Sequence, residues 1–287
     1  MATPEKQELP STYFVQDRSN ESELNRVEVQ GRMITASMGG VLPEQSDPSI
    51  FERVLDVGCG AGDWLIEVAR TYPTASLLIG VDVSRRMIEY ARTQVQAQQV
   101  GDKVEFHMMD ASRTLEFPAQ FFDLVNERFA TSYMRTWDWL NLLGEFQRVT
   151  KPGGVIRITE PDAFVESTSP ALSLYYELFM KAMYQAGHLF TQERDGLKKR
   201  LPSLLHQSGV QNVQTREYTL EYRMGTPEWQ NFYNDVAYGL RTLVPFLRKW
   251  TQVPDDYDTI CQQALDEIKQ PDFVATWRLL TAWGNVP

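Results

Sequence analysis

Residues 54–62 read VLDVGCGAG, and residues 80–84 read GVDVS. The apolar run at 54–57 predicts a buried strand, and Gly58, Gly60 and Gly62 predict a tight turn into a helix over 63–72. Glycine has no Cβ, so the backbone of this turn can approach a ligand closely. Asp82 closes the next apolar run twenty residues later, at the spacing of a carboxylate that accepts ribose hydroxyls. The pair predicts a nucleoside-containing ligand.

The spacing of the glycines decides between two kinds of nucleoside. A dinucleotide site reads G-x-G-x-x-G, whereas this chain reads G-x-G-x-G and places Asp63 where the third glycine would stand. An acid at that position is unfavourable beside a pyrophosphate. Asp56 adds negative charge just before the first glycine. The site is therefore expected to suit a ligand with amine or sulfonium groups and to exclude NAD.

The chain around this motif alternates between strand and helix patterns. Apolar runs at 77–81, 104–109, 121–125 and 155–159 predict further strands, and helical patterns follow Ser84 and cover 137–149. This rhythm is typical of a parallel sheet with helices on both faces. Residues 11–40, 163–208 and 226–270 read as helical additions, and strands are expected at 213–222 and 273–283.

Composition excludes several classes of protein. The chain has 287 residues and a net charge of −10, of which residues 1–52 contribute −5, so a phosphate backbone would be repelled and no nucleic-acid partner is expected. Its two cysteines build no disulfide framework. With no signal-peptide pattern and no long apolar run, we expect no membrane span and a cytoplasmic location. The oligomeric state cannot be predicted from the sequence.

The ordered motifs VLDVGCGAG, GVDVS, Met109-Asp110-Ala111, FDLV and KPGGVIRITE resemble those of class I S-adenosylmethionine-dependent methyltransferases over residues 53–162. Residues 122–128 and 281–284 look like the small-molecule enzymes of quinone or secondary-metabolite pathways, although the ending at 285–287 lacks the usual basic residue. The resemblance implies a Rossmann-like, doubly wound α/β fold. Its sheet would have seven mostly parallel strands, the last antiparallel, with helical lid insertions.

Carried onto this chain, the resemblance implies a set of cofactor-binding residues. The glycines would line the methionine part, Asp82 would hold the ribose, and Asn126, ending the fourth strand, would lie near the methionine amine. The adenine would meet Val83 or Met87, Asp110 and Ala111, while Arg128 would face the pocket, paired with an acid of the N-terminal segment. Tyr13, Arg26 and Gln30 belong to that segment, which covers the cofactor in relatives. Alternative readings are a core Met87, a turn-forming Asp110 and a solvated Arg128.

Catalytic residues are harder to infer, because methyl transfer requires a base only when the acceptor must lose a proton. His188, in the aromatic-rich addition expected to cap the substrate, is our candidate base, and Glu160, ending the fifth strand, could orient the substrate. The alternative for His188 is an exposed lid residue. No cluster has metal-ligand spacing, so we expect no metal.

These observations divide the chain into a helical lid (1–52), an S-adenosylmethionine-binding core (53–162), a substrate-capping insertion with a core helix (163–208), and C-terminal strands with a helical insertion (209–287, insertion 226–270). The expected activity is methylation of a small, partly apolar metabolite at oxygen, nitrogen or carbon. A protein methyltransferase and a non-catalytic S-adenosylmethionine-binding protein remain alternatives. Deleting residues 1–40 is expected to abolish turnover or weaken cofactor binding while the rest of the chain stays folded.

Overall fold

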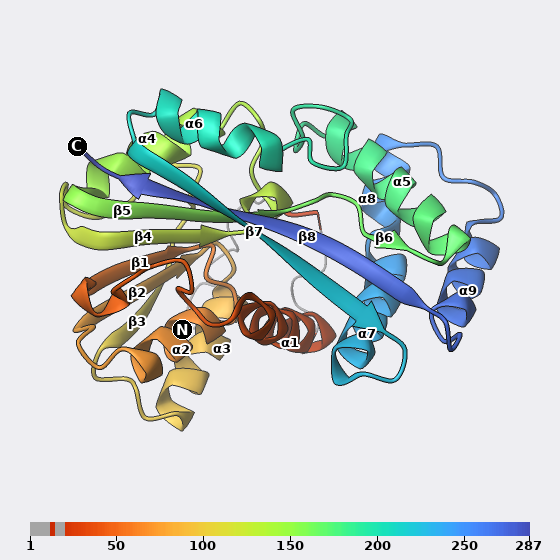
Figure 1. The fold of residues 1–287 in the computed structure, drawn as a ribbon, viewed down its shortest axis with the longest axis horizontal. Coiled ribbons are helices and arrows are strands. Elements are labelled where there is room, and N and C mark those ends of the chain that lie inside the picture. The colour runs from red at the N-terminus through yellow and green to blue at the C-terminus, as the bar shows by residue number, and fades with distance from the viewer. Residues whose placement is uncertain (1–11, 15–20) are drawn as a thin grey trace, which may run out of the picture.

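A computed structural model describes residues 12–14 and 21–287 of the chain (Figure 1). The parts of the predicted N-terminal lid at 1–11 and 15–20 lie outside the described residues. Within the described range, helix α1 (Glu21–Met38) confirms the helical reading of this segment.

One mixed sheet forms the centre of the molecule. Its first five strands, all parallel, are β1 (Arg53–Val57), β2 (Leu77–Asp82), β3 (Val104–Met108), β4 (Phe122–Arg128) and β5 (Thr150–Pro161). β7 (Gln211–Arg223) and β8 (Val274–Asn285) complete it, and β8 runs antiparallel to its neighbours β5 and β7. The order is β3-β2-β1-β4-β5-β8, with β7 outside β8. The predicted seven-stranded fold with an antiparallel last strand is confirmed.

A short eighth segment, β6 (Glu166–Ser167), also pairs with β8. β6 and β5 pair with the same edge of β8, β5 with residues 279–285 and β6 with residues 275 and 276. β7 pairs along the other edge, from residue 274 to residue 285. This two-residue pairing extends the sheet toward the helical additions.

Strand β4 extends further than the sequence pattern predicts. β4 continues through Asn126 and Glu127 to Arg128, although an apolar-run reading ends it at Val125. Two of the three added side chains, Asn126 and Glu127, are fully buried. A polar residue can occupy a buried strand when other buried groups satisfy it, so the hydrophobic pattern alone misplaced this end.

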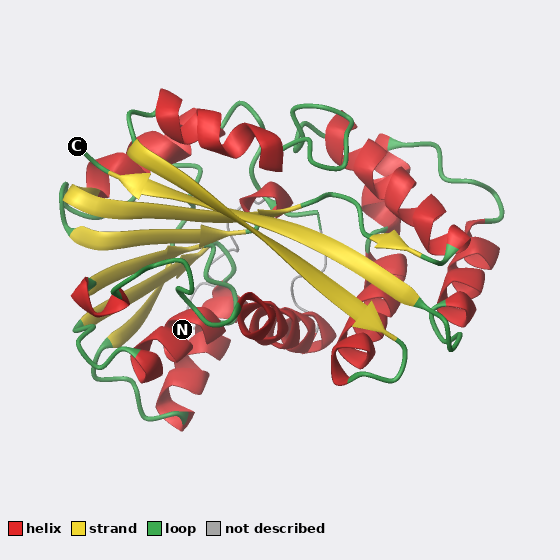
Figure 2. Cartoon of the chain, viewed as in Figure 1, coloured by secondary structure: helices red, strands yellow, loops and turns green. Residues whose placement is uncertain are grey.

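Helices cover both faces of the sheet (Figure 2). α2 (Asp63–Thr71) and α3 (Arg85–Ala97) pack on one face, and α4 (Trp139–Val149) and α6 (Leu201–Gln207) pack on the other. The remaining helices gather beyond the carboxyl ends of the parallel strands: α5 (Pro170–Gln185), α7 (Pro227–Thr242), α8 (Val244–Trp250) and α9 (Tyr257–Glu267). Of the helices in the described residues, none is long and apolar enough to cross a membrane.

Helix α1 lies between the α2 and α3 layer and α7, and it contacts both α2 and α7 (Figure 1). It also contributes Met33, Ile34 and Met38 to the same apolar core as β1, β4 and β5. Deleting residues 1–40 would therefore remove core side chains as well as the proposed lid over the cofactor. The division of the chain into domains stays a prediction.

The last glycine of the predicted ligand-binding turn has a packing role. Gly62 precedes α2 with φ of +79°, and a Cβ there would lie 2.4 Å from the Phe106 Cζ and 2.9 Å from the Ala91 Cβ. The side of Gly62 that would carry a side chain thus faces β3 and α3. The close packing of the first helix on the sheet depends on this missing Cβ.

Replacing Gly62 by alanine should therefore destabilise the fold by about 2–5 kcal/mol, from left-handed strain and overpacking together. The control is Gly144→Ala in α4, where a Cβ meets nothing within 4 Å. That change should stabilise an exposed helical position by about 1 kcal/mol. Urea unfolding of both variants measures the difference, and equal effects would contradict this account of Gly62.

Candidate active site

A cavity of about 630 Å³ opens at the carboxyl ends of β1, β2 and β4 and continues to α5 and α7. The predicted cofactor-binding residues that line it are Tyr13, Asp56, Gly58, Gly60, Asp82, Val83, Met87, Asp110, Ala111 and Arg128. The structure therefore brings together residues spread over more than a hundred positions of sequence. A crevice outside the carboxyl ends of parallel strands, where the sheet order reverses beside β1, is where α/β folds bind ligands.

Hydrogen bonds to β2 hold the glycine turn in place. The Gly58 amide donates to the Val81 carbonyl oxygen at 2.9 Å, and the Gly60 amide donates to Asp82 Oδ2 at 3.1 Å. Asp82 Oδ1 accepts from the Ser84 amide at 2.8 Å. The carboxylate proposed to hold a ribose thus also ties the turn to the start of α3, and each of its oxygens keeps further acceptor capacity.

Close contact from the other wall explains the first glycine of the turn. Gly58 has φ of +69°, and a Cβ would lie 2.7 Å from the Tyr133 hydroxyl oxygen. Any side chain at this position would fill the space between the turn and Tyr133. Gly58 and Gly60 both line the cavity, whereas Gly62 does not. The prediction that Gly62 lines the methionine part is wrong, because that residue packs on the opposite side.

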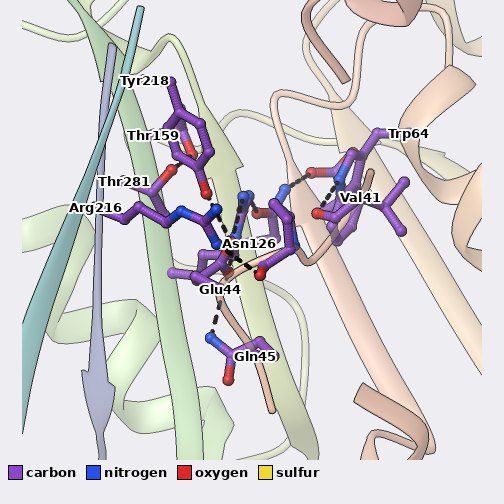
Figure 3. A network of polar contacts seen from close by, with 12 residues as sticks. Val41, Glu44, Gln45, Trp64, Asn126, Thr159, Arg216, Tyr218 and Thr281 are labelled. Carbon is purple, nitrogen blue, oxygen red and sulfur yellow. Dashed lines mark hydrogen bonds and ion pairs between the residues drawn. The ribbon is translucent and has the colours of Figure 1, made fainter. Parts of the chain in front are cut away.

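Asn126 also departs from its predicted place. It does not end β4, it is fully buried, and it is absent from the cavity wall. Its amide nitrogen donates to Asp56 Oδ1 at 2.7 Å, and its amide oxygen accepts from Arg157 at 2.7 Å (Figure 3). The side chain therefore orients Asp56 from behind and is not itself in contact with the cavity.

Asp56 carries the electrostatic character of this end of the cavity. Burial raises the pKa of Asp56 to about 7, although Arg128 and Asn126 both favour its charged form. Burial likewise raises the pKa of Asp63 to about 6 against the opposing effect of Arg128. A cation entering the cavity would restore the charged form of both carboxyls. The site therefore favours a positively charged group.

Arg128 lines the cavity as predicted, but with different partners. Its guanidinium lies 3.8 Å from Asp63 of α2 and donates to the Thr35 hydroxyl at 2.9 Å. The expected ion pair with an acid of the N-terminal segment is wrong, because the acid that pairs with Arg128 is Asp63 at the start of α2. The reading of Arg128 as a solvated surface residue is also wrong, since its side chain is only 13% exposed.

The three residues proposed in the N-terminal segment lie together on the cavity wall. Arg26 donates to the Tyr13 hydroxyl at 3.2 Å and forms an ion pair of 2.7 Å with Asp235 of α7. Gln30 donates to the second oxygen of Asp235 at 3.1 Å. Helix α1 is thereby connected across the cavity to the C-terminal helical insertion.

Asp110 has the position expected of both interpretations, a cavity residue and a turn-forming residue. It lines the cavity, and its Oδ1 accepts from the Ser112 amide at 3.0 Å, as in a turn that follows a strand. Met87 is 5% exposed and lines the cavity beside Val83, while its helical neighbours Ile88 and Ala91 belong to the core.

His188 is not placed as a base should be. It is fully buried, lies off the cavity wall, and its Nδ1 is 3.0 Å from the Met134 carbonyl oxygen. Burial, with Arg135 nearby, lowers the pKa of His188 to about 3. Both expectations for His188, catalytic base and exposed lid residue, are therefore wrong, because α8 and the Phe246 ring pack over it.

Glu160 is also fully buried and absent from the cavity wall. Its carboxyl accepts from the Thr131 amide at 3.3 Å and lies close enough to the Glu127 carboxyl to influence its pKa. Burial raises the pKa of Glu160 to about 8, and burial together with Glu160 raises the pKa of Glu127. The prediction that Glu160 orients the substrate is wrong. It instead fixes the turn after β4, from which Tyr133 reaches the cavity.

The sequence analysis did not predict several wall residues, among them Tyr133, Tyr222 and Asp235. The sequence does contain an indication of Asp235. This residue follows Phe232 by three positions and precedes Gly239 by four, so an acid interrupts the apolar face of a predicted helix. Tyr133 and Tyr222 carry no such signal. Among the described residues, no group of three metal-ligating side chains gathers, and the absence of a metal stays a prediction.

The chain resembles proteins of known activity. The sequence profile of the family described as "Methyltransferase domain" matches residues 54–154. Demethylmenaquinone methyltransferase of Lactiplantibacillus plantarum is 31% identical over 181 residues, which cover 58% of this chain and 73% of that protein. The chain belongs to the class I S-adenosylmethionine-dependent methyltransferases. Aklanonic acid methyltransferase DauC of a Streptomyces species is 33% identical over 135 residues, covering 47% of this methyltransferase and 59% of that protein.

Solved structures agree on the fold. A Haemonchus contortus phosphoethanolamine N-methyltransferase, solved with phosphomonomethylethanolamine and S-adenosylhomocysteine, matches with a TM-score of 0.58. The match has 19% sequence identity and covers 96% of this methyltransferase and 60% of that chain. The cavity here fits the family's cofactor: its glycine turn leaves room beside Tyr133, and its acidic wall suits a sulfonium and an ammonium group.

The pKa of Asp56 makes a prediction about cofactor affinity. Below pH 7 the carboxyl is protonated and loses its attraction for the cofactor's ammonium group, so affinity should rise as pH increases. Between pH 6.0 and 7.5 the expected increase is roughly eightfold for a single group with a pKa near 7. Titration calorimetry with S-adenosylhomocysteine measures it.

The matched control is Asp56→Asn, which keeps the hydrogen bond from Asn126 but does not titrate. Its affinity should vary much less over this range, because Asp63 on the same wall has a lower pKa, of about 6. A pH dependence that is equally steep in the variant would assign the titration to another group.

Asp82→Ala removes the acceptor of the Gly60 and Ser84 amides and, by our prediction, of the cofactor's ribose hydroxyls. The loss should lower cofactor affinity about tenfold or more, since hydrogen bonds to a charged group contribute roughly 1.5–3 kcal/mol. Asp102→Ala, at an exposed position before β3, serves as the control. A dissociation constant for Asp82→Ala equal to that of the control would remove Asp82 from the site.

Proposed function

We propose that this methyltransferase transfers the methyl group of S-adenosylmethionine to a small, partly apolar metabolite by in-line displacement. The observation that carries the proposal is the continuity of one cavity from the glycine turn to a wall of aromatic side chains. Its volume of about 630 Å³ lies in the range of small-molecule sites, roughly 300–1,000 Å³. The acceptor atom is an oxygen, nitrogen or carbon of that metabolite.

The polar end of the cavity suits the cofactor. Asp56 faces the ammonium group, Asp82 accepts from the ribose, and Asp110 receives the adenine amino group beside Ala111. Val83 and Met87 cover the adenine face. The bound cofactor supplies an electrophilic methyl group on a sulfonium, so the chain's own contribution is position, alignment and exclusion of water.

The apolar end suits the methyl acceptor. It is lined by Tyr175, Tyr176, Phe179, Met183, Tyr222, Phe232 and Tyr238, which come from α5, β7 and α7. Flat aromatic walls with a few hydroxyls bind flat or isoprenoid carbon skeletons well. The relatives support this class of substrate, because one is named for demethylmenaquinone and another for aklanonic acid.

No general base is assigned to the transfer. His188 and Glu160 lie behind the wall, and the hydroxyl that reaches the wall nearest the glycine turn is that of Tyr133. Burial and the neighbouring Glu127 raise the pKa of Tyr133 well above its usual value, so this hydroxyl stays protonated and orients groups by hydrogen bonding. An acceptor that is already nucleophilic needs nothing more.

The proposal predicts transfer of label from methyl-labelled S-adenosylmethionine to an extract of small metabolites, with S-adenosylhomocysteine as the second product. Asp82→Ala should transfer much less label at the same cofactor concentration. NAD should cause no heat change in calorimetry. Label found only on protein or nucleic acid would overturn the choice of substrate class, and binding without transfer would leave a cofactor-binding protein.

A further inference from the structure

The two ends of the cavity lie at opposite sides of the sheet. Asp82 ends β2, whereas Tyr222 lies on β7, which is separated from β2 by β1, β4, β5 and β8. Helix α7 follows β7 and brings Asp235 to the same end. Residues at this end are therefore remote from the ribose position and belong to the part of the wall that meets the substrate.

Asp235 is the acid that α5, β7 and α7 contribute to the described part of this wall. One of its oxygens lies 2.7 Å from Arg26 Nη1, and the other accepts from Gln30 at 3.1 Å. The Asp235 side chain is nonetheless 26% exposed, and a carboxylate has about four acceptor positions. It can therefore accept one more hydrogen bond from a group in the cavity.

The ion pair with Arg26 leaves this end without net charge. A substrate carboxylate or phosphate would meet Asp235, and a substrate ammonium would meet Arg26, so neither charge gains from entering. A neutral polar group meets no such opposition. The surrounding Tyr222 and Phe232 rings, stacked at 4.5 Å, require that the rest of the group be apolar.

Tyr222 provides an independent observation. Its side chain is 1% exposed, it lines the cavity, and its hydroxyl oxygen has no hydrogen-bond partner within the described residues. A buried polar group left unsatisfied is costly, so a ligand that satisfies it is favoured. Burial and the Asp235 carboxylate raise the pKa of Tyr222, which keeps its hydroxyl protonated and able to donate.

Resting on the proposed function, we propose that this end of the cavity recognises a neutral hydroxyl group on an aromatic or other flat apolar substrate. The hydroxyl donates to Asp235 and accepts from the Tyr222 hydroxyl. A carbonyl or ether could only accept, and an ammonium group could only donate. A hydroxyl can do both, so it uses both partners.

The test compares two probes of nearly equal size, 2-naphthol and 2-fluoronaphthalene, binding to protein saturated with S-adenosylhomocysteine. The wild type should bind 2-naphthol about tenfold more tightly. Tyr222→Phe should reduce this preference to threefold or less without changing the affinity for S-adenosylhomocysteine. Tyr184→Phe, at a position that is 38% exposed on α5 and outside the cavity, should keep the preference.

Asp235→Asn is the second variant, because it keeps the shape of the side chain and removes its charge. It too should lower the preference for 2-naphthol. Equal binding of the two probes by the wild type, no binding of either at millimolar concentration, or a full preference in Tyr222→Phe would each overturn the proposal. Failure of S-adenosylhomocysteine to bind would instead contradict the proposed function, so the two failures are distinguishable.

Discussion

The buried ion pair between Arg157 and Glu44 joins β5 to the loop that follows α1. Both side chains are 1% exposed, and the Arg157 Nε donates to Glu44 at 2.6 Å. Burial favours the neutral form of Glu44, but the guanidinium outweighs it and lowers the pKa of the carboxyl. From this pair a chain of hydrogen bonds runs through Asn126 to Asp56 (Figure 3). Since a buried charge without its partner is very costly, the ion pair fixes both the loop after α1 and the first strand's end.

Desolvation of carboxyl groups is the second constraint, and it shapes the cavity. Asp56 and Asp63 at the wall, and Glu127 and Glu160 behind it, all have raised pKa values chiefly because they are buried. Such a site stores unfavourable electrostatic free energy that a cationic ligand relieves. The same arrangement disfavours pyrophosphate. The electrostatics of the folded chain thus favour a nucleoside with amine or sulfonium groups over a dinucleotide such as NAD. The spacing of the glycines indicates the same choice.

Local patterns predicted the sheet and several residues that line the cavity. The strands, the glycine turn and Asp82 are encoded in short segments whose hydrophobicity and spacing reflect their structure directly. The wrong predictions concern Gly62, Asn126, His188 and Glu160. Each of these four residues is placed by a contact with another part of the chain. Gly62 meets β3, Asn126 meets Arg157, Glu160 meets the Thr131 amide, and His188 lies under Phe246. Asp235 was missed for the same reason, because its partner Arg26 lies 209 residues earlier.

The position of β8 has a consequence for how the chain acquires its fold during synthesis. This strand is the last of the described sheet in sequence, yet it lies between β5 and β7, and it is paired along its length with β7. Until residues 274–285 leave the ribosome, the edges of β5 and β7 that β8 later covers have no strand partner. The residues of α5 and α7 have already been synthesised by then. Exposed edges of this kind invite association with other chains. The sheet therefore cannot be completed before β8 is synthesised, although its partner β5 lies more than a hundred residues earlier in sequence. The cavity wall that includes Tyr222 of β7 is completed only after β8 has paired.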